Sequence, residues 1–448
     1  MKKIILAFLS IIIFSSFTLA QNGEYIKDSS QGCLVLNDNG RDGITVTWTG
    51  PCKDNYADGE GTLTWFQNGE LAAKYEGHMQ KGISQGKGKY TFPGWGSMEG
   101  NFVDGVMQGQ GRVDMENGGK LEGNFVDGNM LDLDAKYLSR LQKNDLGIKD
   151  ATGIYKGGNS ETLFYYALVP EGKVKGVLVL FPSTGEGVEN VISCNKKLMQ
   201  NCYDNNIMTV AIASNYNKGL ESDPASMHFF NTVFTEIITK YNVPADKFIL
   251  SGLSLGGENA LQYTEMSRDP KHDTSIKPLG AIGVDPPVDM ANLYRGAKEE
   301  IAKYMRDSMN ITPAKQQALD EDNFLMDYFH GLYGGSPEEF PQKYIDASQF
   351  SLNQPDGGNA KYLLDVPVRI YTDPDILWQM KNKSRSYYNM NCADQSAMIN
   401  FLQMNGNTRA EFIPALGKGY RLDGTRHPHS WSIVDADECT EWMLKLIN

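Results

Sequence analysis

The chain has 448 residues, of which 41% are hydrophobic and 22% are charged, and its formal net charge is −13. This length exceeds what one hydrophobic core usually holds, so we expect two folded parts. The composition is that of a globular protein, and the negative charge disfavours nucleic acid or an anionic membrane surface as a partner.

The first twenty residues follow the pattern of a secretory signal peptide. Lys2 and Lys3 precede an apolar run at residues 4–14, and small residues ending in Ala20 follow. A basic start, a short hydrophobic region and small residues at the end are typical of a cleaved leader. The pattern predicts cleavage after Ala20 and an exported protein, periplasmic or extracellular, with neither a lipid anchor nor a transmembrane segment.

The cysteine pattern permits disulfide bonds. An even number of cysteines in an exported protein is compatible with a disulfide framework. The closest pairs in sequence are Cys33 with Cys52 and Cys194 with Cys202, but spacing alone leaves the pairing open. No C-x-x-C pair is present, so we do not expect a structural zinc site. The six cysteines are Cys33, Cys52, Cys194, Cys202, Cys392 and Cys439.

Between about residues 45 and 130 the sequence repeats itself. Short alternating runs at residues 61–65 and 88–92 follow paired glycines, as expected of hairpin strands whose turns need positive φ. A period in the twenties predicts an array of stacked units. The glycines that recur at 23-residue steps are Gly77, Gly100 and Gly123, and those that follow each of them five residues later are Gly82, Gly105 and Gly128.

These spacings resemble those of MORN repeats, whose pattern runs aromatic-x-Gly, a further glycine five residues on, and then Gly-x-Gly. Tyr75 fits the aromatic position, whereas Met98 and Leu121 stand where the family usually has tyrosine. The resemblance implies a ribbon of β-hairpins over residues 21–130 and a module for protein or lipid contact. Passive packing of the ribbon on the following domain is the alternative.

Residues 131–150 are expected to form a short helix and a linker, and beyond them strand-like and helix-like stretches alternate. Near-continuous apolar runs suit strands buried on both faces, and the alternation predicts an α/β fold with a mostly parallel sheet flanked by helices. Charged and aromatic helical sequence at residues 293–351 interrupts this order and predicts a lid insertion. The expected strands are 177–181, 208–212, 248–250, 279–284, 368–371 and 410–413, and the expected helices are 229–241, 258–266, 393–404 and 431–447.

A G-x-S-x-G motif follows the expected strand at residues 248–250. Ser254 stands between Gly252 and Gly256, an arrangement in which a strand turns sharply into a helix and holds one hydroxyl out at the turn. A serine that merely capped the helix would not need glycine on both sides. The motif therefore predicts that Ser254 is a nucleophile.

A serine hydroxyl needs a neighbouring base, and two histidines are placed to serve. Only His427 and His429 lie between the last expected strand and the C-terminal helix. His429 opens that helix and is the preferred base, with His427 as the alternative. The two could also form a metal pair, but no cysteine or carboxylate cluster lies nearby in sequence, and we expect no metal.

The base in turn needs a carboxylate, and three aspartates qualify. Asp375 and Asp373 follow the expected strand at residues 368–371, and Asp285 ends the strand at residues 279–284. Each could instead be a solvated loop aspartate, a common state beside proline. Asp375 is the preferred acid, and the other two stay open.

The order of strand, Gly-Leu-Ser-Leu-Gly, helix, late acid and last histidine resembles the α/β-hydrolase fold over residues 151–448. The resemblance implies an acid at Asp375, the usual position, although some members carry it at the position of Asp285. One oxyanion donor would be the N–H of Leu255, directly after the serine. The second would lie in the loop after residues 177–181, at Thr184 or Gly185, although the His-Gly often found there is absent.

Together these features predict an exported serine hydrolase that cleaves an ester rather than an amide, through an acyl-enzyme and without a cofactor. Its substrate would be a small ester or acylated molecule. The preference for esters rests on the hairpin ribbon, since some related peptidases carry a propeller instead. The alternative is a binding or scaffold protein that uses its repeats and whose hydrolase domain is catalytically silent.

Overall fold

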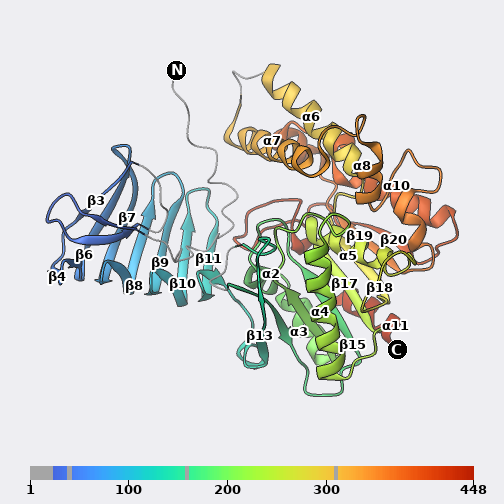
Figure 1. Cartoon of the computed structure of the whole chain (residues 1–448), viewed down its shortest axis with the longest axis horizontal. Helices are drawn as coiled ribbons and strands as arrows, with labels where there is room; N and C mark the ends of the chain where they lie inside the picture. Colours follow the sequence, from blue (N-terminus) through green and yellow to red (C-terminus); the bar gives the residue numbers. More distant parts are fainter. Residues whose placement is uncertain (1–23, 38–42, 157–160, 307–310) are drawn as a thin grey trace.

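The computed structural model describes residues 24–37, 43–156, 161–306 and 311–448. The expected signal peptide at residues 1–20 lies outside these ranges. An elongated antiparallel β-sheet leads into a larger α/β domain, and a group of helices lies on that domain (Figure 1). No helix among the described residues is long and apolar enough to cross a membrane.

The front part is a ribbon of hairpins, because most strands of its eight-stranded sheet pair with their neighbours in the chain. In spatial order the strands are β12 (Asn129–Met130), β11 (Lys120–Val126), β10 (Val106–Met115), β9 (Gly96–Val103), β8 (Ile83–Phe92), β7 (Glu70–Gln80), β6 (Gly59–Gln67) and β3 (Ile44–Trp48). A smaller sheet joins β1 (Glu24–Lys27), β2 (Leu34–Asn37), β5 (Tyr56–Ala57) and β4 (Cys52–Lys53). The antiparallel β region expected from the repeat is present.

The repeated glycines make room for side chains that fill the ribbon. A Cβ at Gly88 would lie 2.4 Å from the ring of Tyr75, which is fully buried, and a Cβ at Gly123 would lie 2.8 Å from the methyl carbon of Met130. Both approaches are closer than van der Waals contact, so a side chain at Gly88 would collide with the buried ring, whereas one at Gly123 would require the end of Met130 to move. The period in the sequence therefore reflects a small residue that faces a large one in each successive hairpin.

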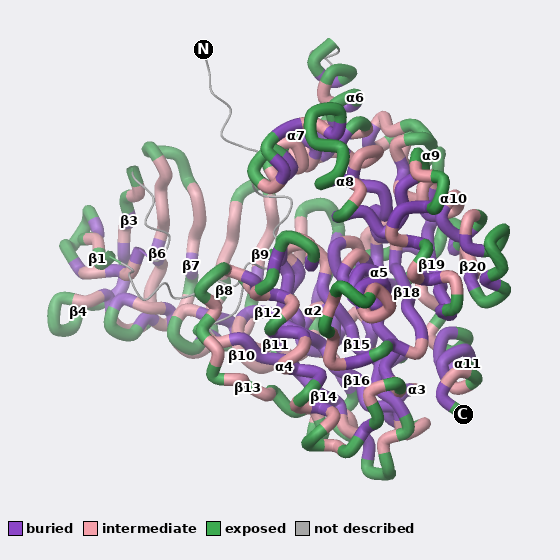
Figure 2. Tube along the Cα trace, turned by 45° about the vertical axis from the view of Figure 1, so that its right-hand side comes forward, coloured by how far each residue is buried: buried purple, intermediate pink, exposed green. Residues whose placement is uncertain are grey.

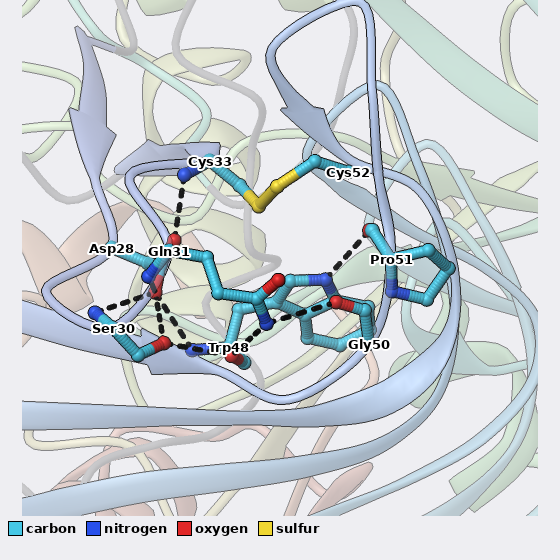
Figure 3. The surroundings of a disulfide bond; sticks show 8 residues. All are labelled: Asp28, Ser30, Gln31, Cys33, Trp48, Gly50, Pro51 and Cys52. Atoms are coloured by element: carbon cyan, nitrogen blue, oxygen red, sulfur yellow. Dashed lines mark hydrogen bonds between the residues drawn. A yellow bond between two sulfur atoms is a disulfide. The ribbon is translucent and has the colours of Figure 1, made fainter.

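A disulfide bond joins Cys33 to Cys52 of β4 (Figure 3), and β4 lies at the outer end of the ribbon (Figure 1). Beside it the buried carboxylate of Asp28 accepts the backbone N–H of Cys33 at 2.6 Å and that of Ser30 at 2.9 Å. This is one of the two closest pairs in sequence; the other pair, Cys194 and Cys202, is not bonded. The cysteines free of disulfides are Cys194, Cys202, Cys392 and Cys439.

The α/β domain is built on a second eight-stranded sheet. Its spatial order is β13 (Leu141–Lys149), β14 (Thr162–Leu168), β16 (Ile207–Ile212), β15 (Gly176–Phe181), β17 (Phe248–Leu253), β18 (Gly280–Val284), β19 (Val368–Thr372) and β20 (Ala410–Pro414). The six strands from β15 to β20 are mutually parallel, and β13 and β14 form an antiparallel edge. The prediction of a mostly parallel sheet is confirmed.

Helices cover both faces of this sheet. Side chains of β15 alternate between two cores: Leu178 packs with helices α3 (Lys196–Asp204) and α11 (Ala436–Ile447), and Val179 packs with α4 (Pro224–Tyr241) and α5 (Leu255–Met266). Because both faces are covered, the central strands are buried along their length (Figure 2). This is why their sequences are continuously apolar.

Two expectations about local structure differ from the observed elements. The expected linker at residues 131–150 contains the short helix α1 (Ala135–Leu138), but it then forms β13, the first strand of the sheet. The expected helix at residues 431–447 begins only at Ala436, because Asp435 caps it by accepting the N–H of Glu438. A short 3-10 turn, η4 (Trp431–Ile433), precedes it.

The helical insertion lies between β18 and β19. It contains α6 (Met290–Arg306), α7 (Pro313–Tyr333), α8 (Pro341–Ala347) and the 3-10 helix η2 (Gly358–Leu363). The first three share a core of their own, in which Phe329, Tyr333 and Tyr344 are buried. Of the remaining elements, α2 (Val188–Cys194) follows β15, α9 (Ile376–Lys383) follows β19, and η3 (Tyr387–Asn389) and α10 (Asn391–Met404) precede β20.

Candidate active site

Ser254 stands at a strained turn between β17 and α5. Its backbone has φ of 56° and ψ of −120°, a region that residues with a side chain rarely adopt. Its N–H donates to the carbonyl oxygen of Val284, the last residue of β18, at 3.0 Å. Strain of this kind persists only where the surrounding structure imposes it, and it is concentrated at functional sites.

Three glycines hold this turn in place. A Cβ at Gly252 would lie 2.1 Å from the carbonyl carbon of Gly256, and a Cβ at Gly256 would lie 2.1 Å from the carbonyl oxygen of Phe181. A Cβ at Gly257 would lie 2.9 Å from the Cβ of Pro286. The turn is therefore wedged between the end of β15 and the residues after β18. This contact explains why the motif requires glycine on both sides of the serine.

His429 is bonded to Asp285. Its Nδ1 lies 2.7 Å from Oδ2 of Asp285, which directly follows β18. The other carboxylate oxygen, Oδ1, accepts from Nε2 of Gln395 at 2.9 Å and from Oγ1 of Thr372 at 3.1 Å. A carboxylate at Nδ1 assigns the proton to that nitrogen and leaves Nε2 as the acceptor. The ring is thus oriented to act as a base.

The serine and the aspartate flank the same strand end. Val284, which accepts the N–H of Ser254, is the residue before Asp285. Asp285 itself has φ of 45°, a second strained position, and its N–H donates to the carbonyl of Tyr371 at 2.8 Å. The ends of β17, β18 and β19 are therefore tied together at the point where these functional groups are attached.

The preferred pairing of His429 with Asp375 does not occur. Asp375 caps helix α9 by accepting the N–H of Trp378 at 2.9 Å, and its Oδ2 pairs with Arg426 at 2.9 Å. The carboxylate is occupied by a helix terminus and a guanidinium, and Nδ1 of His429 bonds to Asp285 instead. Of the three aspartates considered, the structure brings Asp285 to His429.

Asp373 is also engaged elsewhere. Its buried carboxylate pairs with Arg426 at 2.8 Å and accepts the N–H groups of Gly417 and Gly419 at 3.0 and 2.8 Å. These bonds anchor the segment of residues 417–429. In that segment Tyr420 bridges to Arg426, and the N–H of His427 donates to the carbonyl of Gly419 at 3.0 Å, which makes a hairpin that ends next to His429.

His427 supports this segment, and no carboxylate of the described residues forms an ion pair with it. Its Nδ1 lies 3.1 Å from the carbonyl oxygen of His429, and its ring packs edge-on against Trp378 with centroids 5.2 Å apart. Burial, together with the charges of Arg421 and Lys383, lowers the pKa of His427 well below its ordinary value. The neutral ring therefore braces the backbone that carries His429.

The oxyanion candidates lie beside the serine. The N–H of Leu255 belongs to the first turn of α5, where backbone donors have no helical partner and the helix dipole is positive. The contact of Gly256 with Phe181 brings this turn against the loop that holds Thr184 and Gly185. The N–H of Gly185 donates to the carbonyl of Asn215 at 3.0 Å, so Thr184 is the better placed of the two.

Sequence reasoning missed Glu186, which lies in this same loop. Its Oε2 accepts the N–H of Ser183 at 2.9 Å, and Nε1 of Trp431 lies 3.0 and 3.1 Å from its two oxygens. Burial raises the pKa of Glu186 to about 7. A glutamate between a strand and a helix has no spacing signal that would have distinguished it from a surface residue.

The hairpin ribbon contacts both loops of the site. The N–H of Lys120 donates to the carbonyl of Asp423 at 3.1 Å, and Leu422 packs against the core of the ribbon. At the other loop a Cβ on Gly187 would lie 2.7 Å from Oδ1 of Asn129 in β12. The ribbon therefore packs against two segments: the one that precedes His429 and the one that follows Thr184.

Among residues 24–37, 43–156, 161–306 and 311–448, no group of three or more histidine, cysteine, aspartate or glutamate side chains could hold a metal ion. His427 and His429 lie with ring centroids 6.5 Å apart, and their neighbours are a carbonyl and a single carboxylate.

No protein-family model and no curated protein matches the sequence. Among solved structures, an esterase of the archaeon Pyrobaculum calidifontis is similar at 15% identity, over 69% of this chain and 83% of that one, with a TM-score of 0.40. An esterase of Rhizomucor miehei is similar at 13% identity, over 68% and 84%, with a TM-score of 0.42. The Mycobacterium tuberculosis protein MPT51 is similar at 13% identity, over 68% and 98%, with a TM-score of 0.40. Similarities of this size do not establish a function, which we infer from the geometry of the site.

Proposed function

We propose that this protein is a serine hydrolase that cleaves ester bonds with Ser254, His429 and Asp285. The observation that carries the proposal is the 2.7 Å bond between His429 and Asp285, at the strand end that accepts the N–H of Ser254. A base oriented by a carboxylate beside a strained serine is the arrangement that activates a hydroxyl. Asp285 replaces Asp375 as the proposed acid.

In the proposed reaction the proton of Ser254 passes to Nε2 of His429 while Oγ attacks the ester carbonyl. The N–H groups of Leu255 and Thr184 would stabilise the oxyanion, and Asp285 would stabilise the imidazolium. The alcohol leaves with the proton from His429. Water, deprotonated by His429, then releases the acid from the acyl-enzyme, and no cofactor takes part.

We also propose that the front ribbon is a MORN-type array and that the protein is exported. The recurring contact of a glycine with a large side chain, as between Gly88 and Tyr75, supports the first statement. The disulfide between Cys33 and Cys52 supports the second, because such bonds persist in oxidising compartments. The contacts of Leu422 and Asn129 favour a structural contribution of the ribbon to the catalytic domain, beside any partner it binds.

Turnover of a panel of short acyl esters and peptide amides by the mature protein tests the proposal. We expect hydrolysis of esters that is lost in Ser254→Ala, with an unfolding transition that matches the parent. Amide cleavage without ester cleavage would overturn the substrate class. Equal turnover in the parent and in Ser254→Ala would overturn the role of the serine.

A further inference from the structure

A single buried carboxylate joins the two loops of the proposed active site. Glu186 is 7% exposed and accepts N–H groups from Ser183 on one side and from Trp431 on the other. Ser183 directly precedes Thr184, and Trp431 is two residues after His429. The carboxylate therefore connects the oxyanion loop to the segment that carries the base.

On the oxyanion side Glu186 closes a tight turn. Its side chain accepts the N–H of Ser183 at 2.9 Å, and its own N–H donates to the carbonyl of Ser183 at 3.1 Å. Thr184 and Gly185 are enclosed between these bonds, and the carbonyl of Asn215 takes the N–H of Gly185 at 3.0 Å. The direction of the N–H of Thr184 thus depends on the carboxylate that closes the turn.

On the other side Glu186 fixes the segment after His429. The indole of Trp431 is buried in the core, 4% exposed, and its Nε1–H points at both oxygens of the carboxylate. Among the described residues no lysine or arginine lies within ion-pair distance of Glu186. An anion buried without a cation disfavours folding, so its retention here points to a functional use.

Resting on the proposed function, we infer that Glu186 is a positioning residue of the hydrolase: its ionised carboxylate sets the place of Thr184 relative to His429 and stabilises the imidazolium. A negatively charged Glu186 attracts a protonated His429, as stabilisation of the imidazolium requires. The imidazolium forms as Ser254 attacks, so the charge helps the transition state more than the ground state.

This role of Glu186 makes catalysis depend on pH in a specific way. The titratable groups that face Glu186 are His429, Cys194 of α2 and Tyr155 before β14. Burial raises the pKa of Glu186 to about 7, against an ordinary value of 4.5, so the ionised form is lost as pH falls through 7. Because the base must be neutral and Glu186 ionised, the acid limb of kcat/KM should fall more steeply than a one-proton limb.

The sign for stability is opposite. Between pH 4.5 and about 7 the native state binds more protons at Glu186 than the unfolded state does. The contribution of Glu186 to the free energy of unfolding therefore falls as pH rises across this window and does not change further above it. Removing the charge should relieve this loss while it weakens catalysis, a combination that a purely structural role would not give.

The test compares Glu186→Gln with Glu189→Gln. Glu189 is the matched control, since it is a buried carboxyl of raised pKa on the neighbouring helix but bonds to Tyr166 at 2.9 Å. We expect Glu186→Gln to lower kcat for a short ester at pH 8 by about 10- to 100-fold with little change in KM. Its acid limb should become a one-proton limb, and its melting temperature relative to the parent should rise from pH 5 to pH 8. Glu189→Gln should keep the steep limb.

A second variant and a labelling control keep the outcomes distinct. Trp431→Phe keeps an aromatic side chain and removes the N–H at Glu186, so it should lower kcat in the same direction even if Glu186→Gln folds poorly. Parent protein that reacts with a fluorophosphonate, together with unchanged kcat and limb slope in Glu186→Gln, overturns this inference alone. Failure of the parent to react overturns the proposed function itself.

Discussion

The imidazole of His429 is bonded to the carboxylate of Asp285, which lies 144 residues earlier in the chain. Asp285 follows β18, whereas Asp375, the acid that sequence position favoured, follows β19. Asp375 does not bind His429, because its carboxylate pairs with Arg426 at 2.9 Å. We therefore propose Asp285 as the acid, because Asp375 already has a cation as its partner. Asp285 has hydrogen-bond donors and the imidazole, but among the described residues no lysine or arginine pairs with it.

Substituting the two aspartates in parallel separates their roles. Asp285→Asn should lower kcat for a short ester by about 10⁴-fold, because an amide cannot hold the required tautomer or stabilise the imidazolium. Asp375→Asn should change kcat little and lower the free energy of unfolding by about 1 kcal/mol, since it removes the charge from a partly buried ion pair with Arg426, while asparagine can still cap the helix. Steady-state kinetics and denaturant unfolding of both variants provide the measurement. A larger kcat loss in Asp375→Asn would contradict the assignment.

The glycine after the serine should be intolerant of a side chain. Gly256→Ala places a Cβ 2.1 Å from the carbonyl oxygen of Phe181, so the turn must shift, and we expect loss of ester turnover or of folding. Gly331→Ala is the control, because a Cβ there meets nothing within 4 Å in helix α7. It should raise the free energy of unfolding by about 0.5–1 kcal/mol and leave turnover unchanged. Wild-type activity in Gly256→Ala would contradict the geometry of the turn.

The contact between the ribbon and the hairpin before His429 should affect catalysis. Leu422→Ala removes packing against the ribbon core, and we expect a loss of about 1–2 kcal/mol in the free energy of unfolding together with a several-fold fall in kcat. Leu416→Ala is the control in the same stretch, since that side chain is 65% exposed. Ester kinetics and thermal unfolding would be measured side by side. Equal effects of the two variants would indicate that the ribbon does not hold this hairpin.

The disulfide should stabilise the ribbon without acting on the site. The cysteines are 19 residues apart, and closing a loop of this length contributes about 3 kcal/mol. We expect reductant to lower the stability of the ribbon in the parent and to leave a variant carrying Cys33→Ser and Cys52→Ser unchanged, with ester turnover retained in both below their melting temperatures. Denaturant unfolding with and without reductant checks this. A reductant effect of the same size in the double variant would assign the stabilisation to another cause.

How far the sequence predicts the fold depends on burial. The strands β15 to β18 were expected because they are buried along their length and almost continuously apolar. Strands β19 and β20 were expected although they contain Arg369 and Glu411. Strand β13 was missed because it is an edge strand whose residues 142–145 are all polar, so it has no apolar run. Strand β14, though buried, was missed as well.

The candidate site was predictable from the sequence only in part. A short motif and a position in the chain each point to one residue, so the sequence alone suffices to propose Ser254 and His429. It does not single out an acid, because Asp285 and Asp375 both follow a strand, and only the three-dimensional contacts of His429 and Arg426 distinguish them. Glu186 could be recognised as a candidate only from its bond to Trp431, which is distant in the sequence.

Mapping the adduct of a fluorophosphonate on the intact protein tests the central claim most directly. The proposal predicts a single adduct on the peptide that contains Ser254, formed at similar rates in the parent and in Asp375→Asn and at least about 100-fold more slowly in Asp285→Asn. An adduct on another residue, or equal rates in the parent and Asp285→Asn, would contradict it.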